Sequence, residues 1–455
     1  MTHQMKNQIK WILFFLTWVL IPAGSATLFA TPTVPDSGPV YPSARFIVIS
    51  DLHYYDTSLG TTGTAFQTYL DNDRKLLVLS DEIIGTAMDK IAGEAADFVL
   101  VAGDMTKDGE KICHQGVARH LKMLVQSGKK VFVVPGNHDI NNPDSVRFTG
   151  DITEPTPSID PAAFKNIYGD LGYGSAIAQD PDSLSYVAEP VQGLWILALD
   201  SNRYKENRPD HPPLIGGAFS EQTLAWIETQ LIAAQRENKA VIVLQHHGIM
   251  EHYPANEKFY KKYLVNDHQR IATLFARYNV RLVFTGHFHA QDVTEKKIAD
   301  TGQLIFDIET GSMVTAPCPY RRVELTKNES GSTHAVITSQ FITSIPSLGD
   351  GFADYADTYV FEGTKKLANA ALAKYKVSAE QLPLINGQVA VAYSAHLKGD
   401  EIKPPITLDS SEFGYWLKFV AWMQEDLIDG WWTDLAPRDN DLVIDLATGR
   451  VNDRK

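Results

Sequence analysis

Residues 131–140 of the chain read VFVVPGNHDI. Four apolar, β-forming residues run directly into Pro-Gly, which predicts a short buried strand that ends in a turn. Three polar side chains follow at once, Asn137, His138 and Asp139. In a parallel α/β sheet, ligands bind beside the loops at the carboxyl ends of the strands. Alone, this stretch predicts either a functional loop or an ordinary capped turn. Other parts of the sequence distinguish these two interpretations.

Four other apolar runs also end in Asp or His, and each has the pattern of a buried strand. These predicted strands are residues 45–50, 97–102, 240–244 and 281–284. The i, i+2 spacing of Asp51 with His53, and of His287 with His289, would point each pair to one side of an extended backbone. Seven side chains should therefore converge at one sheet edge: Asp51, His53, Asp104, Asn137, His246, His287 and His289.

These seven side chains are too many for one tetrahedral zinc ion, which takes three or four ligands. They suit two adjacent metal ions, with the lone carboxylate of Asp104 as the bridge. Mixed oxygen and nitrogen ligands favour divalent or mixed-valence Mn, Fe or Zn over thiolate-seeking metals. Two such ions about 3.5–4 Å apart lower the pKa of a shared water towards about 7, which supplies a hydroxide at neutral pH. The spacing does not decide between His246 and its neighbour His247 as the ligand.

Together these motifs resemble the five sequence blocks of the calcineurin-like metallophosphoesterase superfamily, over residues 45–343. The resemblance implies an α/β fold, a four-layer α/β/β/α sandwich with two stacked sheets and a dinuclear metal site. It divides the ligands between two ions: Asp51, His53, Asp104 and His289 for one, and Asp104, Asn137, His246 and His287 for the other. It favours His246 over His247, which would lie behind the ligands or near the substrate. It also implies that His138 protonates the leaving alkoxide, and that Asp139 orients the imidazole of His138.

The residues around the motifs indicate which branch of the superfamily the chain resembles. The run GDMTKDGE, residues 103–110, lacks the Arg of the GDxxDRG motif of protein Ser/Thr phosphatases. It carries Lys107 where purple acid phosphatases need Tyr, and GNHD replaces the usual GNHE of the nucleotidases. The runs GDMTKDGE and VFVVPGNHDINNP, the His-His pair and the C-terminal extension resemble secreted bacterial phosphodiesterases of the cyclic-nucleotide (class III) type.

This resemblance implies a phosphodiesterase that acts on small phosphodiesters, cyclic nucleotides among them, by in-line attack of a hydroxide that bridges the two metals. A diester carries one negative charge, so it needs fewer cationic side chains than a monoester does. The alternatives are a broad phosphomonoesterase and a metal-binding scaffold without catalysis. Such scaffolds typically lose histidine ligands, whereas all seven ligand positions are retained here.

The first 26 residues have the pattern of a signal peptide. Lys6 and Lys10 precede an apolar run of about 11 residues, and small residues follow it. The run is shorter than the roughly 20 residues of a membrane-spanning helix, although an uncleaved anchor is the alternative. Cleavage after Ala26 or Ala30 predicts a secreted or periplasmic protein with no membrane attachment.

The remaining chain is expected to hold a linker (27–43), a phosphoesterase domain (44–343) and a mainly helical C-terminal domain (351–455). Residues 71–96 are expected to form one long helix, and the aromatic stripe that contains Trp416 is expected to pack as core. A net charge of −14, without a long basic run, argues against nucleic-acid binding. Cys113 and Cys318 are expected to be free thiols, or at most an incidental bridge. The oligomeric state is not indicated.

Overall fold

A computed structural model describes residues 39–327 and 331–453 of the chain. All of the described residues belong to one compact unit. The predicted signal peptide and most of the predicted linker lie outside the described residues. None of the helices in the described part of the chain is long and apolar enough to cross a membrane.

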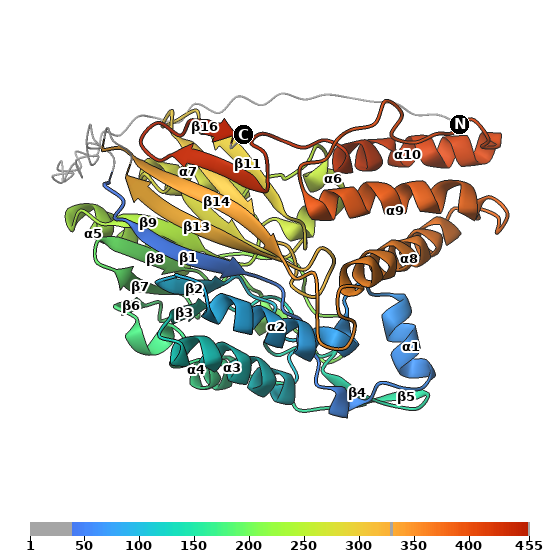
Figure 1. The fold of residues 1–455 in the computed structure, drawn as a ribbon, viewed down its shortest axis with the longest axis horizontal. Coiled ribbons are helices and arrows are strands. Elements are labelled where there is room, and N and C mark those ends of the chain that lie inside the picture. Colours follow the sequence, from blue (N-terminus) through green and yellow to red (C-terminus); the bar gives the residue numbers. More distant parts are fainter. Residues whose placement is uncertain (1–38, 328–330, 454–455) are drawn as a thin grey trace, which may run out of the picture. The chain divides into compact units, whose positions relative to one another are not determined.

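Two seven-stranded sheets form the centre of the fold (Figure 1). The first has the order β16-β15-β14-β13-β1-β2-β3, with bounds Val451–Asp453, Asp441–Asp445, Thr333–Phe341, Pro319–Lys327, Ala44–Ile49, Phe98–Val101 and Lys130–Val133. The second has the order β11-β12-β10-β9-β8-β7-β6, with bounds Asp292–Lys297, Leu304–Glu309, Leu282–Thr285, Ala240–Leu244, Leu194–Ala198, Tyr186–Val191 and Ala178–Gln179. A separate hairpin pairs β4 (Val146–Thr149) with β5 (Ile152–Pro155).

The strands that lead to the predicted ligands run parallel within each sheet. β1, β2 and β3 are parallel neighbours in the first sheet, as are β8, β9, β10 and β12 in the second. Every residue of β2 and of β9 is buried, as expected for parallel strands covered on both faces. The ring of Phe46 on β1 meets the ring of Phe284 on β10 edge-on at 5.4 Å, so the two sheets share one core.

Helices cover the outer faces of both sheets. α2 (Ser80–Ala92) and α3 (Lys111–Gln126) lie on the first sheet, and α5 (Glu221–Arg236) and α7 (His268–Arg277) pack on the second (Figure 1). The expected α/β/β/α sandwich is therefore confirmed. Shorter helices are α1 (Thr64–Asp71), α4 (Pro161–Ile167) and α6 (Asn256–Tyr260). Short 3₁₀ turns occupy Thr57–Leu59, Leu77–Leu79, Tyr173–Ser175, Tyr204–Glu206 and Lys261–Tyr263.

The long helix expected over residues 71–96 is wrong in extent, because α2 covers only part of that range and a loop precedes α2. α1 ends at Asp71 and α2 begins only at Ser80. Between them, Oδ1 of Asp73 accepts the main-chain N–H groups of Arg74 and Lys75 at 2.6 and 2.9 Å. An Asp side chain that bonds to its own following backbone competes with a helix, so the apolar periodicity of this stretch was misleading.

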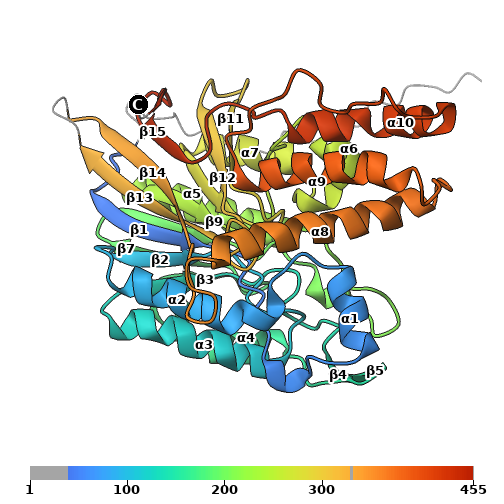
Figure 2. The same cartoon turned by 45° about the vertical axis from the view of Figure 1, so that its right-hand side comes forward.

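The C-terminal part combines the expected helices with two unexpected strands. α8 (Phe352–Ala373), α9 (Leu382–Lys398) and α10 (Tyr415–Trp431) lie side by side in both views (Figures 1 and 2). β15 and β16 then extend the first sheet beyond β14. Trp416 is 50% exposed and Trp422 67% exposed, so this part of the α10 stripe is not core. Cys113 and Cys318 are buried free thiols, as expected.

Candidate metal centre

The predicted ligands follow the carboxyl ends of five strands, and the structure brings all of them together. β1 leads to Asp51 and His53, β2 to Asp104, and β3 to Asn137 and His138. From the second sheet, β9 leads to His246, and β10 to His287 and His289. The loops at the carboxyl ends of these strands therefore lie close together, although they come from two different sheets. The sequence predicts this convergence.

The backbone at these residues is not extended, although the i, i+2 spacing predicts an extended one. Asp51 and His53 have φ values of 50° and 37°, and His287 and His289 have values of 82° and 74°. Residues other than glycine rarely adopt this left-handed region, and those that do cluster at functional sites. The main-chain N–H groups of Asp51 and His53 donate to the loop after β2, at 3.1 and 2.9 Å. The pairs thus converge through tight turns held between neighbouring loops.

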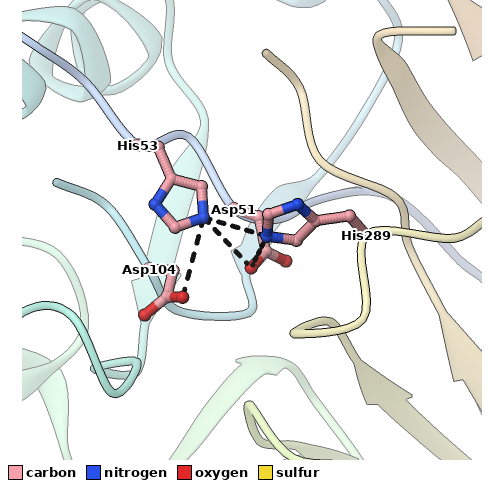
Figure 3. A group of neighbouring side chains, drawn as sticks. All are labelled: Asp51, His53, Asp104 and His289. Carbon is pink, nitrogen blue, oxygen red and sulfur yellow. Dashed lines mark hydrogen bonds and ion pairs between the residues drawn. The ribbon is translucent and has the colours of Figure 1, made fainter. Parts of the chain in front are cut away.

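The first cluster is made of Asp51, His53, Asp104 and His289 (Figure 3). One ligand atom from each lies within 4.8 Å of all the others. Nε2 of His53 lies 3.0 Å from Nε2 of His289 and 3.6 Å from Oδ2 of Asp104. Three of the four residues are buried, and the side chain of His289 is 14% exposed. The four side chains therefore aim their ligand atoms at one point.

The second cluster contains Asp104 again, together with His246 and His287. Oδ2 of Asp104 lies 3.3 Å from Nε2 of His246, and that nitrogen lies 3.1 Å from Oδ1 of Asn137. Asp104 is 1% exposed and belongs to both clusters. It therefore has the position that a bridging carboxylate between two ions requires.

Hydrogen bonds behind the histidines fix which nitrogen faces each cluster. Nδ1 of His246 donates to the carbonyl of Ala102 at 2.8 Å, which leaves Nε2 free for a ligand role. Both nitrogens of His247 are already engaged, with Ser201 Oγ at 2.7 Å and the Ile215 carbonyl at 2.8 Å. The geometry therefore selects His246 over His247, a choice that spacing alone left open.

The residues of the first cluster fit a bound cation. Oδ1 of Asp51 is buried without a hydrogen-bond partner, although it lies 3.3 Å from Nε2 of His289. Burial opposes its charge, yet neighbouring histidines, first of all His289, hold the pKa of Asp51 well below its usual range. Burial also lowers the pKa of His53 to about 3, so its imidazole is neutral. The imidazoles of His53 and His289 and the orphaned carboxylate oxygen of Asp51 form an O/N donor set that a divalent transition metal satisfies.

The orienting role predicted for Asp139 is wrong, and the structure gives it to Asp108. Nδ1 of His138 lies 2.8 Å from Oδ1 of Asp108. The fully buried carboxylate of Asp139 instead accepts the main-chain N–H groups of Gly136, Met105 and Thr106, at 2.8, 3.2 and 3.0 Å. Asp139 therefore clamps the loops after β2 and β3 together. The sequence did contain a signal for Asp108, the second acid of GDMTKD.

A lysine beside the clusters was also missed. Lys75 is 7% exposed and pairs with Asp73 at 3.1 Å, on the loop between α1 and α2. Besides burial, the positive charge of Lys75 lowers the pKa of His53, a member of the first cluster. The ring centroid of Tyr263 lies 4.4 Å from that of His287, a member of the second cluster. A cation therefore acts on the first cluster, and an aromatic ring contacts the second.

Comparison with known proteins gives a family and two similar structures. No curated protein matches the chain. The chain is similar to a dimetal phosphatase from Danio rerio, at 18% identity, over 67% of this chain and 96% of that one, with a TM-score of 0.46. It is also similar to the NAD nucleotidase of Haemophilus influenzae, at 13% identity, over 67% of this chain and 50% of that one, with a TM-score of 0.34. The family model described as calcineurin-like phosphoesterase matches residues 44–291, more than half of the chain. The chain therefore belongs to the calcineurin-like phosphoesterase family.

Proposed function

We propose that this metal-dependent phosphoric ester hydrolase is an exported phosphodiesterase that cleaves small-molecule phosphodiesters. The proposal rests on the position of Asp104. This residue belongs to both ligand clusters, and its Oδ2 lies 3.9 Å from Nε2 of His138. A pair of divalent ions bound there would supply an activated water and polarise the phosphoryl oxygens. Export rests on the signal-like pattern of residues 1–26.

His138 is the residue placed to move a proton. Its Nδ1 is held by Asp108, so its Nε2 points towards Asp104 and the shared metal position. Burial opposes its charge, but the carboxylates of Asp104 and Asp108 raise the pKa of His138 above its usual value. Its side chain is 25% exposed, in contrast to the fully buried His53. A protonated Nε2 can therefore reach the ester oxygen that leaves when the P–O bond breaks.

The two lysines discussed here, Lys75 and Lys107, are both paired with carboxylates, and this favours a diester substrate over a monoester. The side chain of Lys107 is fully buried against Asp108, with Nζ 3.0 Å from Oε1 of Glu110, so it is not available to a substrate. Lys75 is engaged by Asp73. A monoester dianion would gain from a free, bidentate Arg, and none stands in the GDMTKDGE run. A diester monoanion needs less compensating charge.

The test compares bis-p-nitrophenyl phosphate with p-nitrophenyl phosphate in the presence of Mn²⁺. We expect the larger kcat/KM on the diester, and Asp104→Asn protein purified in parallel should be inactive on both, which excludes a contaminating phosphatase. A much faster monoester rate would establish the phosphomonoesterase alternative instead. Metal-loaded protein with no activity on either compound would favour the scaffold alternative.

The substrate itself is then found by a screen of cyclic nucleotides, glycerophosphodiesters and dinucleotides. Cyclic nucleotides are the first class to test, because the sequence resembles class III phosphodiesterases and an aromatic ring, that of Tyr263, flanks the ligands. Release of a monoester product from one of these classes, with none from the others, would define the specificity.

A further inference from the structure

A further group of side chains with the donor atoms of a metal site comes from the end of α9 and the start of β11. The ribbons of α9 and β11 lie beside each other (Figures 1 and 2). Asp292 begins β11, His396 lies in the last turn of α9, and Glu401 follows in the next loop. One ligand atom from each lies within 4.8 Å of the other two. Nδ1 of His396 is 2.7 Å from Oε1 of Glu401 and 3.8 Å from Oδ2 of Asp292. None of the three belongs to the two clusters around Asp104.

One carboxylate oxygen of this group is buried without a hydrogen-bond partner. The side chain of Glu401 is 1% exposed; its Oε1 faces His396, and its Oε2 has no hydrogen bond. An orphaned, buried oxygen acceptor indicates that a cation is missing from this group.

The cationic side chains nearby do not supply it. His252 uses Nδ1 on Asp292 at 2.7 Å, and its Nε2 faces Asp307 at 3.4 Å. Arg321 is fully buried, but its guanidinium donates to main-chain carbonyls and to a serine hydroxyl. Within the described residues, neither side chain makes a hydrogen bond or an ion pair with Glu401, whose only hydrogen-bonding partner there is His396.

We propose that Asp292, His396 and Glu401 bind a third divalent transition metal ion. One imidazole nitrogen and two carboxylate groups form a donor set that suits Zn²⁺ or Mn²⁺. The ion takes the place of the proton that His396 Nδ1 shares with Glu401, and that proton leaves to solvent. A fourth coordination position remains for water.

The proposed ion has a structural role. It joins α9 and the following loop to β11, and so ties the C-terminal helices to the second sheet. The ring of His396 also lies 5.3 Å from the ring of Phe288, which stands between His287 and His289. Fixing His396 therefore supports the turn that carries two ligands of the dinuclear centre.

The test is the metal content of the purified full chain after exposure to Zn²⁺ and dialysis. Wild-type protein should retain about three ions per chain, and Glu401→Gln should retain one fewer. His396→Gln is a second variant and should lose the same ion. Glu380→Gln, which changes an exposed glutamate outside the group, is the matched control and should retain the wild-type content.

Thermal unfolding gives an independent readout. Adding Zn²⁺ to metal-free protein should raise the Tm of Asp104→Asn, and the same addition should raise the Tm of Asp104→Asn/Glu401→Gln clearly less. Equal metal content in wild type, Glu401→Gln and His396→Gln would overturn the third site. Wild-type protein that retained the third ion but held no ions around Asp104 would overturn only the dinuclear centre, so the two claims fail separately.

Discussion

Nδ1 of His138 lies 2.8 Å from Oδ1 of Asp108, a residue thirty positions earlier in the chain. Asp108 is itself 3% exposed and is fixed by an ion pair with the buried Lys107. Because the imidazole is held from behind, its Nε2 keeps its direction towards Asp104, 3.9 Å away. Asp108 is therefore a positioning residue for the proton transfer that His138 is proposed to make.

Replacing Asp108 by Asn should lower kcat while KM and metal content stay close to the wild-type values. The amide no longer favours the charged imidazole, so the pH profile of kcat should lose its alkaline shoulder. Steady-state kinetics on bis-p-nitrophenyl phosphate between pH 5 and 9 measure both effects. Asp89→Asn, an exposed aspartate on α2, is the control. An unchanged pH profile with reduced metal content would instead make Asp108 a structural residue of the ligand loops.

Removing the imidazole itself should have a larger effect. His138→Ala should lower kcat by about 10²–10⁴, the usual contribution of general acid catalysis. Its metal content should remain that of the wild type, since His138 is not among the ligand clusters. Elemental analysis beside the kinetics checks this, and a variant that loses metal would exclude the proton-donor role.

Asp139 should matter for stability rather than for catalysis. Its two carboxylate oxygens accept three main-chain N–H groups and the hydroxyl of Thr106. In Asp139→Asn, an amide NH₂ would face two of those donors, and unmade buried hydrogen bonds cost about 1–3 kcal/mol each. Urea unfolding should therefore show a lower free energy of unfolding for Asp139→Asn than for the wild type and for the control Asp89→Asn. Equal stabilities would argue against the clamp.

The buried His114 should make the fold sensitive to acid. It is fully buried, bonded to Tyr168 and to the carbonyl of Asp139, and burial lowers its pKa from 6.5 to about 3. Between these values only the unfolded chain binds the proton, so stability falls as the pH falls below 6.5, by about 1.4 kcal/mol per pH unit at most. His114→Gln removes this contribution.

The measurement is the free energy of unfolding of wild type and His114→Gln from pH 7 to pH 4.5. All other titrating groups are common to both proteins, so the difference isolates His114. As the pH falls, the free energy of unfolding of the wild type should decrease more than that of His114→Gln. A constant gap between the two stabilities would show that His114 is protonated equally in the folded and unfolded states.

The ligand positions could be predicted because each follows a short apolar run with strong β character. That signal is local, and the meeting of parallel strand ends is a general property of such sheets. The reason given for Asp51 and His53 was nevertheless wrong, since left-handed turns replace the extended backbone. Those turns depend on hydrogen bonds to the loop after β2, which lies about fifty residues away and leaves no mark in the local pattern.

The misassigned elements also depended on contacts distant in sequence. Asp108 and Asp139 are both plausible partners for His138, and only the folded loops show which carboxylate reaches it. β15 is five residues long and gains its stability by pairing with β14, more than a hundred residues earlier. Lys75 is held by Asp73, whose side chain turns the chain where periodicity predicted a helix.

The central claim is that two ions lie together on Asp104. Electron paramagnetic resonance of Mn²⁺-loaded protein tests it most directly, because ions about 3.5–4 Å apart in a two-metal site are magnetically coupled. Wild-type protein should give the spectrum of a coupled Mn²⁺ pair, and Asp104→Asn should lose that signal. A wild-type spectrum of isolated Mn²⁺ ions alone would contradict the dinuclear centre.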